Sequence, residues 1–107
     1  MSGEGLIAEP RAVHASVGHA RLKELMHRGT EFLGCKVAIL GGAMSWVSER
    51  SLVSAISNAG GFGVIACGAM SPELLDTEIA ETKARTDRPF GVNLITMHPA
   101  LMELIDT

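Results

Sequence analysis

The chain has 107 residues, of which 47% are hydrophobic, so it is long enough for one domain and too apolar for a disordered segment. Its formal charge is −3 at pH 7 and its basic residues are dispersed, which argues against nucleic-acid binding. No apolar run approaches the roughly 20 residues of a membrane-spanning helix. The amino terminus also lacks a secretory pattern, so we expect a cytoplasmic protein.

The two cysteines, Cys35 and Cys67, lie far apart and lack the close spacing of metal ligands. In a reducing cytoplasm such residues are mostly free thiols packed inside the protein. We therefore expect buried free thiols and no metal site, with a disulfide or a reactive thiol as the alternatives.

The first 20 residues mix small and polar side chains without a regular period, which indicates a flexible lead-in to a domain at 21–107. The domain opens with apolar residues spaced i, i+3, i+4 within residues 21–28. This spacing predicts a short amphipathic helix, which Gly29 would end.

Three short apolar runs further along the chain are typical of strands that are buried on both faces. They cover Val37–Leu40, Phe62–Ala66 and Phe90–Ile95. A helical pattern separates each run from the next, so the chain alternates between strands and helices.

The first of these helices is predicted over Glu49–Ala59, with Ser48 as its N-cap and the Gly60–Gly61 pair as its end. Apolar residues recur along it with the period of one helix face. We expect this face to be buried; it consists of Leu52, Ala55, Ile56 and Ala59.

Two more helices carry their own start signals. Ser71–Pro72–Glu73 combines an N-cap, a first-turn proline and an early acid, and predicts a helix that runs to about Thr86. The pair His98–Pro99 opens a last helix.

Strands that alternate with helices predict an α/β protein with a parallel sheet and right-handed crossovers. Two architectures fit this order: an open doubly wound sheet, and the first part of a (β/α)8 barrel. Three strand ends rich in glycine, methionine or amide side chains suggest that several strands contribute to one face, which favours the barrel.

Two segments that follow predicted strands carry the residues best suited to a ligand. Gly41–Ser48 begins with a glycine-rich turn, and glycine lets a flat ligand press against bare backbone. Asn93 ends the third strand with an amide that can both donate and accept hydrogen bonds. Because the carboxyl ends of parallel strands meet at one edge, these segments predict one side of a cofactor pocket.

Each of these residues also has a structural explanation that needs no ligand. The paired glycines can form a tight strand-to-helix turn. Asn93 can satisfy backbone groups of a loop, and Met44 can fill space in a core.

Three blocks of the sequence carry a resemblance to a known family: Gly42–Val47, Ser57–Ile65 and Thr86–Leu94. In their order and spacing, the chain from about Arg21 to Asp106 resembles the amino-terminal part of the nitronate monooxygenases, formerly called 2-nitropropane dioxygenases. These are FMN-dependent (β/α)8 barrels related to the flavin-dependent enoyl-ACP reductases. The resemblance implies the amino-terminal part of a (β/α)8 TIM barrel, about three βα units long.

The resemblance implies cofactor-binding roles for two of the blocks. Gly42, Ala43 and Met44 would line the isoalloxazine ring of FMN. Asn93 would contact the same cofactor through its carboxamide. Ala43 departs from the glycine that the family usually has, and narrows the space at the flavin by one methyl group.

The family's catalytic histidine and its phosphate-binding glycine loops lie beyond the region covered. The resemblance therefore assigns no catalytic residue and no metal ligand here. The histidines of this chain match none of the family's positions; they are His14, His19, His27 and His98.

For the complete protein, the resemblance implies FMN-dependent oxidation of alkyl nitronates with molecular oxygen. The alternatives are a flavin-dependent enoyl-ACP reductase, a non-catalytic truncated product, and a small open-sheet nucleotide-binding module. Three parallel strands cannot close a barrel, so we expect the isolated chain to lack turnover and its open sheet edges to favour self-association. We expect no nucleic-acid or membrane partner.

Overall fold

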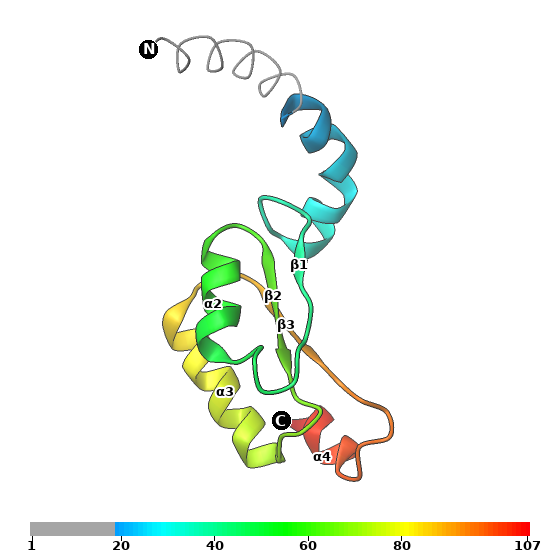
Figure 1. Cartoon of the computed structure of the whole chain (residues 1–107), viewed down its shortest axis with the longest axis vertical. Coiled ribbons are helices and arrows are strands. Elements are labelled where there is room, and N and C mark those ends of the chain that lie inside the picture. Colours follow the sequence, from blue (N-terminus) through cyan, green and yellow to red (C-terminus); the bar gives the residue numbers. More distant parts are fainter. Residues whose placement is uncertain (1–18) are drawn as a thin grey trace, which may run out of the picture.

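The computed structural model describes residues 19–107, so most of the predicted lead-in at 1–20, including His14, lies outside the described residues. The described chain forms a parallel sheet in the order β1-β2-β3, with helices between the strands (Figure 1). The strands are β1 Leu40–Gly41, β2 Phe62–Ala66 and β3 Phe90–Asn93. The helices are α2 Arg50–Asn58, α3 Pro72–Arg85 and α4 Leu101–Asp106. A further helix occupies residues 19–33.

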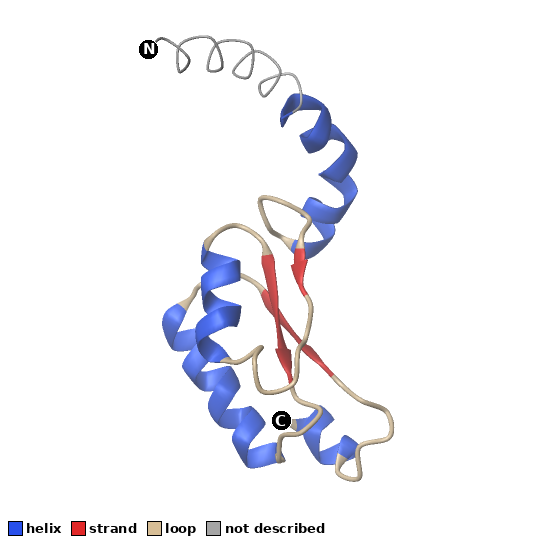
Figure 2. Cartoon of the chain, in the orientation of Figure 1, coloured by secondary structure: helices blue, strands red, loops and turns tan. Residues whose placement is uncertain are grey.

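Each strand pairs with the strand that precedes it in the sequence, and α2 and α3 lie on the same side of the sheet (Figure 2). The pairing register aligns Gly41 with Gly63, and Ala66 with Asn93. A (β/α)8 barrel begins in this way. Half of a doubly wound sheet has the same order, so strand order alone does not separate the two predicted architectures.

The core lies between the helices and one face of the sheet. Its buried residues are Val53, Ile65, Cys67, Met70, Leu75 and Leu104. Phe90 and Val92 of β3 pack against this cluster. Because side chains alternate along a strand, Gly91 and Asn93 lie on the opposite face, which the helices leave uncovered.

Helix α2 rests directly on the backbone of β2 at Gly63. A Cβ at this position would lie 2.4 Å from the carbonyl oxygen of Val53, which is backbone and cannot rotate away. Ser57 fixes the same contact, because its hydroxyl accepts from Gly63 N–H and donates to the Pro89 carbonyl, at 3.1 and 2.9 Å.

Gly63→Ala is therefore expected to lower the free energy of unfolding by about 1–3 kcal/mol, the usual cost of overpacking a tight core. Gly42→Ala is the matched control, since a Cβ there would meet nothing within 4 Å. Urea denaturation of both variants measures the difference. Equal stability of the two variants would mean that α2 can move away from β2 at little cost.

An ion pair between the buried Glu78 and the partly exposed Arg50 joins the start of α2 to the middle of α3. The Glu78 carboxylate accepts from Arg50 Nε and Nη2, at 3.0 and 2.6 Å, and from Arg50 backbone N–H at 2.9 Å. These hydrogen bonds from Arg50 hold the pKa of Glu78 below its usual range, although burial acts in the opposite direction. Arg50 and Arg85 also lie 3.6 Å from the more exposed Glu81.

The predictions for β2 and α3 are confirmed. Strand β2 has the predicted bounds, and the Ser71 hydroxyl caps α3 by accepting from Leu74 N–H at 3.2 Å. Pro72 occupies the first turn, and the helix ends one residue before Thr86.

The first helix is longer than predicted, and Gly29 does not end it. It continues to residue 33 and ends at Gly34, which has a φ of +67° and donates to the Thr30 carbonyl. This left-handed residue is the usual helix-ending glycine. Gly29 instead allows close packing, because a Cβ there would lie 2.7 Å from that of Ala38.

Both outer strands are shorter than predicted. The N–H groups of Lys36 and Val37 both donate to the Gly60 carbonyl, so the first apolar run bends and pairs only from Leu40. Strand β3 ends at Asn93, and the predicted continuation to Ile95 is a loop in which His98 N–H donates to the Ile95 carbonyl.

Helix α2 differs from its prediction in both its cap and its buried face. Its N-cap is Glu49, whose carboxylate accepts from Ser51 and Leu52 N–H. The buried residues are Val53, Ser54 and Ser57, whereas Ala55 and Ala59 are exposed. Leu52 and Ile56 are half-buried, so only part of the predicted face is exposed, and hydrogen bonds satisfy both buried serine hydroxyls.

The last helix, α4, begins later than predicted, at Leu101 with Ala100 as its N-cap residue. His98 lies just before it, and its Nδ1 accepts from Ala100 N–H at 3.0 Å. No helix within residues 19–107 is long and apolar enough to cross a membrane.

Candidate functional site

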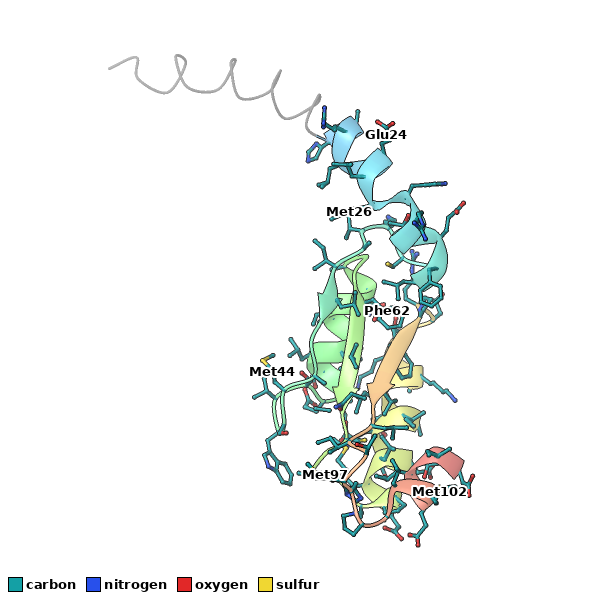
Figure 3. All side chains as sticks on the ribbon, turned by 90° about the vertical axis from the view of Figure 1, so that its right-hand side faces the viewer. Glu24, Met26, Met44, Phe62, Met97 and Met102 are labelled. Atoms are coloured by element: carbon teal, nitrogen blue, oxygen red, sulfur yellow. The ribbon has the colours of Figure 1, made fainter. Side chains whose placement is uncertain are left out.

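The carboxyl ends of the three strands form one end of the sheet, and the segments that follow them gather there. The Gly42–Ser48 segment follows β1, Cys67 follows β2, and Asn93 is the last residue of β3. Figure 3 shows Met44 and Met97 on loops at this end. The predicted site residues therefore share one end of the sheet.

Ser48 holds the turn after β1 in shape. Its buried hydroxyl accepts from Met44 N–H at 2.9 Å and donates to the Gly42 carbonyl at 3.1 Å. Its own carbonyl accepts from Ala66 N–H at 3.0 Å, which ties the turn to the end of β2. The predicted capping role of Ser48 is therefore wrong, since its hydroxyl closes the turn before α2 instead.

This turn presents bare backbone to open space. The Ser48 hydroxyl hydrogen-bonds the Gly42 carbonyl and the Met44 N–H. The N–H of Gly42 and the N–H and C=O groups of Ala43 make no hydrogen bond to a protein group within residues 19–107. Among the described glycines, Gly42 alone has neither a positive φ nor an atom within 4 Å of the position that a Cβ would occupy. Within residues 19–107 neither backbone strain nor packing explains a glycine here, and the space beside it is open.

Apolar side chains surround this turn without being buried. Met44 is 51% exposed and Trp46, which has a φ of 65°, is 73% exposed. Met44 is therefore not core filler among the described residues, and Trp46 is not packed against the described chain. An exposed apolar rim next to free backbone hydrogen-bonding groups suits a ligand that is flat, apolar and polar at its edge.

Asn93 is held by Cys67 on the neighbouring strand end. Its Oδ1 accepts from Cys67 N–H at 3.1 Å, and its backbone carbonyl accepts from the Cys67 thiol. The carboxamide nitrogen of Asn93 bonds no protein group within residues 19–107. The side-chain oxygen of Asn93 therefore satisfies a backbone N–H, which is the structural role predicted for this residue. Its two side-chain N–H groups remain available to a ligand.

Both cysteines are free, as predicted; Cys67 is buried and Cys35 half-buried. Burial raises the pKa of the Cys67 thiol, so it remains protonated at neutral pH. His98, on the loop after β3, uses its Nδ1 at the start of α4 and so acts as a local cap.

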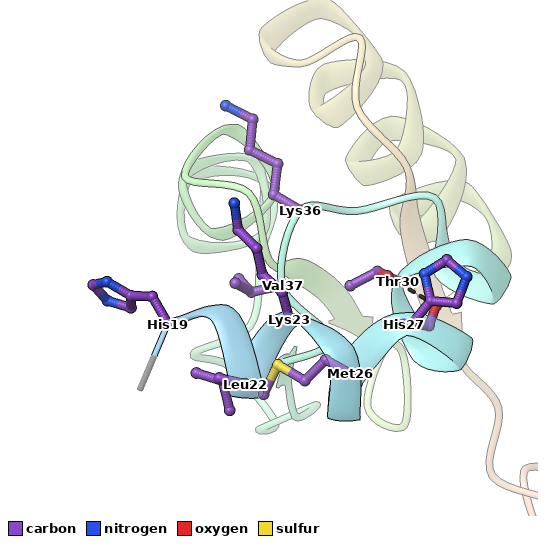
Figure 4. Close-up of a pocket in the computed structure, with 8 residues that line it drawn as sticks. All are labelled: His19, Leu22, Lys23, Met26, His27, Thr30, Lys36 and Val37. Carbon is purple, nitrogen blue, oxygen red and sulfur yellow. Dashed lines mark hydrogen bonds between the residues drawn. The ribbon is translucent and has the colours of Figure 1, made fainter. Parts of the chain in front are cut away.

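A groove of about 290 Å³ lies away from this end of the sheet, between the first helix and the segment before β1 (Figure 4). Its lining includes Leu22, Met26 and Val37, with His19, His27 and Thr30 beside them. The groove therefore contains none of the predicted cofactor-binding residues.

Ser48→Ala is expected to weaken ligand binding at the strand ends about three- to tenfold, because the turn loses both hydrogen bonds that fix its shape. Ser45→Ala is the control, since Ser45 is an exposed residue of the same loop. Titration of both variants with FMN, the cofactor that the resemblance implies, compares them. A Ser48→Ala variant that binds like the Ser45→Ala variant would show that the hydroxyl does not shape the turn.

Together, the consecutive parallel strands and the bare backbone at their carboxyl ends define an α/β protein with a candidate ligand site at the strand ends. The sequence profile of the nitronate monooxygenases matches residues 27–107. The chain belongs to the nitronate monooxygenase family, a family of oxidoreductases.

Individual relatives agree with this assignment. A nitronate monooxygenase from Paraburkholderia phytofirmans is 40% identical over 68 residues, which is 64% of this chain and 19% of the relative. A (3aS,4S,5R,7aS)-5-hydroxy-7a-methyl-1-oxo-octahydro-1H-indene-4-carboxyl-CoA dehydrogenase from Mycobacterium tuberculosis is 43% identical over 65 residues, 61% of this chain and 18% of the relative. The chain thus spans about a fifth of the length of these curated relatives.

The structure of FabK from Thermotoga maritima superposes with a TM-score of 0.72 at 42% identity, covering 74% of this chain and 25% of that chain. With the family assignment, this similarity decides between the two predicted architectures. The fold is the amino-terminal part of a (β/α)8 TIM barrel, as predicted.

Proposed function

We propose that the complete protein binds FMN at the strand ends and oxidises alkyl nitronates with molecular oxygen. Membership of the nitronate monooxygenase family supports the reaction class. The observation that carries the cofactor assignment is the open space beside Gly42, where the chain itself gives no reason for a glycine.

The residues present fit a flavin. Gly42 leaves room for a flat ring, and the backbone groups of Ala43 can bond its polar edge. Met44 supplies apolar surface beside that ring, and the free carboxamide N–H groups of Asn93 can donate to it. Ala43 itself is exposed, so its methyl group is not packed against residues 19–107.

When bound, FMN supplies the transfer of electrons from the nitronate to oxygen. The work of this chain is to seat and orient the ring. The turn held by Ser48 fixes one wall of the site, and Asn93 fixes a second. The apolar rim at Met44 and Trp46 would exclude water from the face of the site. We assign no catalytic residue to this chain.

The test is the visible spectrum of the purified complete protein, followed by oxygen consumption with the anion of 2-nitropropane. We expect a bound-flavin spectrum and nitronate-dependent uptake of oxygen. A colourless protein that binds no added FMN would overturn the cofactor assignment. A flavin-bound protein that consumes no oxygen with nitronate would overturn the reaction.

One relative favours a second candidate. The M. tuberculosis protein is a carboxyl-CoA dehydrogenase by name, and the substrate in that name is a thioester. A thioester oxidoreductase, such as the enoyl reductase predicted as an alternative, would use the same flavin site. Oxidation of NADH or NADPH that depends on an enoyl thioester, without nitronate activity, would favour this candidate.

A further inference from the structure

Cys67 contacts Asn93 at two points. Its backbone N–H donates to the Asn93 side-chain oxygen at 3.1 Å, and its thiol donates to the Asn93 main-chain carbonyl. One residue at the end of β2 therefore holds both the backbone and the side chain of the last residue of β3 (Asn93).

Cys67 is itself held firmly. Its side chain is fully buried and packs in the core cluster with Ile65, Met70 and Leu75. The thiol keeps its proton at neutral pH, because burial raises its pKa, and it can therefore donate. The contact thus links Asn93 to the rigid interior and not to a mobile loop.

This contact decides which way the carboxamide faces. An N–H donor can bond only the oxygen of the amide, so Oδ1 points toward Cys67 and the two N–H groups point away from it. Asn93 lies on the sheet face that α2 and α3 leave uncovered, opposite the core. The donors are therefore preset toward the open end of the site before a ligand arrives.

We propose that Cys67 is a positioning residue for Asn93: its thiol holds the Asn93 backbone in the place from which the carboxamide oxygen reaches the Cys67 N–H, and this bond turns the carboxamide N–H groups toward the flavin. The inference rests on the proposed function, because it assumes that Asn93 donates to FMN. Cys67 itself does not touch the ligand in this proposal.

The experiment compares Cys67→Ala with Cys67→Ser in the complete protein. Alanine removes the side-chain donor, whereas serine keeps one, and neither changes the backbone N–H. We expect Cys67→Ala to weaken FMN binding about three- to tenfold, the effect of one neutral hydrogen bond, and to shift the flavin absorption bands. Cys67→Ser should recover most of the affinity and the wild-type spectrum.

Val53→Ala is the control for a purely structural effect. Val53 belongs to the same core cluster and is fully buried, but it does not bond Asn93. We expect it to lower stability at least as much as Cys67→Ala and to leave FMN affinity and the flavin spectrum unchanged.

A flavin-independent measurement separates this inference from the proposed function. In the flavin-free protein, the NMR signals of the Asn93 carboxamide, assigned with Asn93→Asp, should move in Cys67→Ala and return in Cys67→Ser. If Asn93→Ala weakens FMN binding and Cys67→Ala does not, the positioning role is wrong and the proposed function stands. If the wild-type protein binds no FMN, the proposed function fails whatever the NMR signals show, and the flavin role of Cys67 fails with it.

Discussion

Replacing Gly42 with leucine is expected to weaken FMN binding about ten- to a hundredfold while leaving the fold intact. A Cβ at Gly42 meets no atom of this chain within 4 Å, so the new side chain would enter the open space beside the turn. That is the space we assign to the ring. The loss of affinity would therefore come from overlap with the ligand and not from unfolding.

The control for this prediction is Ala80→Leu, which adds a leucine at an exposed position of α3. Fluorescence titration with FMN and thermal unfolding of both variants separate binding from stability. Gly42→Ala should show a smaller loss in the same direction. Wild-type affinity in Gly42→Leu would contradict the proposed contact between the ring and this turn.

Glu78→Gln is expected to lower the free energy of unfolding by about 1–3 kcal/mol, because the buried group loses its charge and one of the two oxygens that accept from Arg50. The Glu78 carboxylate also satisfies a backbone N–H at the start of α2, so its loss weakens the contact between α2 and α3. Glu81→Gln is the matched control one turn along α3. Its contacts to arginine are 3.6 Å long and half exposed, so we expect less than about 1 kcal/mol.

The pH dependence gives a second measure of the same carboxylate. The folded state lowers the pKa of Glu78, so its contribution is fully present above the ordinary glutamate pKa of about 4.3 and is lost as the pH falls through the lowered value. Denaturation at several pH values should show the gap between wild type and Glu78→Gln closing as the solution becomes acidic. A gap that stays constant down to strong acid would mean that the charge of Glu78 contributes nothing.

Local signals explain which parts of the fold could be predicted. The apolar run of β2 and the Ser71–Pro72 start of α3 are complete within a few residues, and both predictions are confirmed. One failure involves a partner far away in the sequence. Ser57 is buried in α2 because its hydroxyl donates to the carbonyl of Pro89, 32 residues later. The spacing of apolar residues along a helix cannot predict such a bond.

The same distinction applies to the candidate site. Gly42 and Asn93 could be singled out because they lie at the ends of predicted strands and within blocks that resemble the family. The residues that hold Gly42 and Asn93 in place could not be predicted. The sequence predicts a helix cap at Ser48 and an ordinary buried thiol at Cys67, whereas both residues bond the candidate site. A one-dimensional pattern shows a functional group but not what fixes its direction.

The order of the strands also has a consequence for how the chain acquires its shape. Because each strand pairs with the one made just before it, every new pairing closes a loop of only one βα unit. The entropy lost in such closures is modest and similar at each step. The segment can therefore assemble in the order of its synthesis, each finished strand serving as the template for the next one to leave the ribosome.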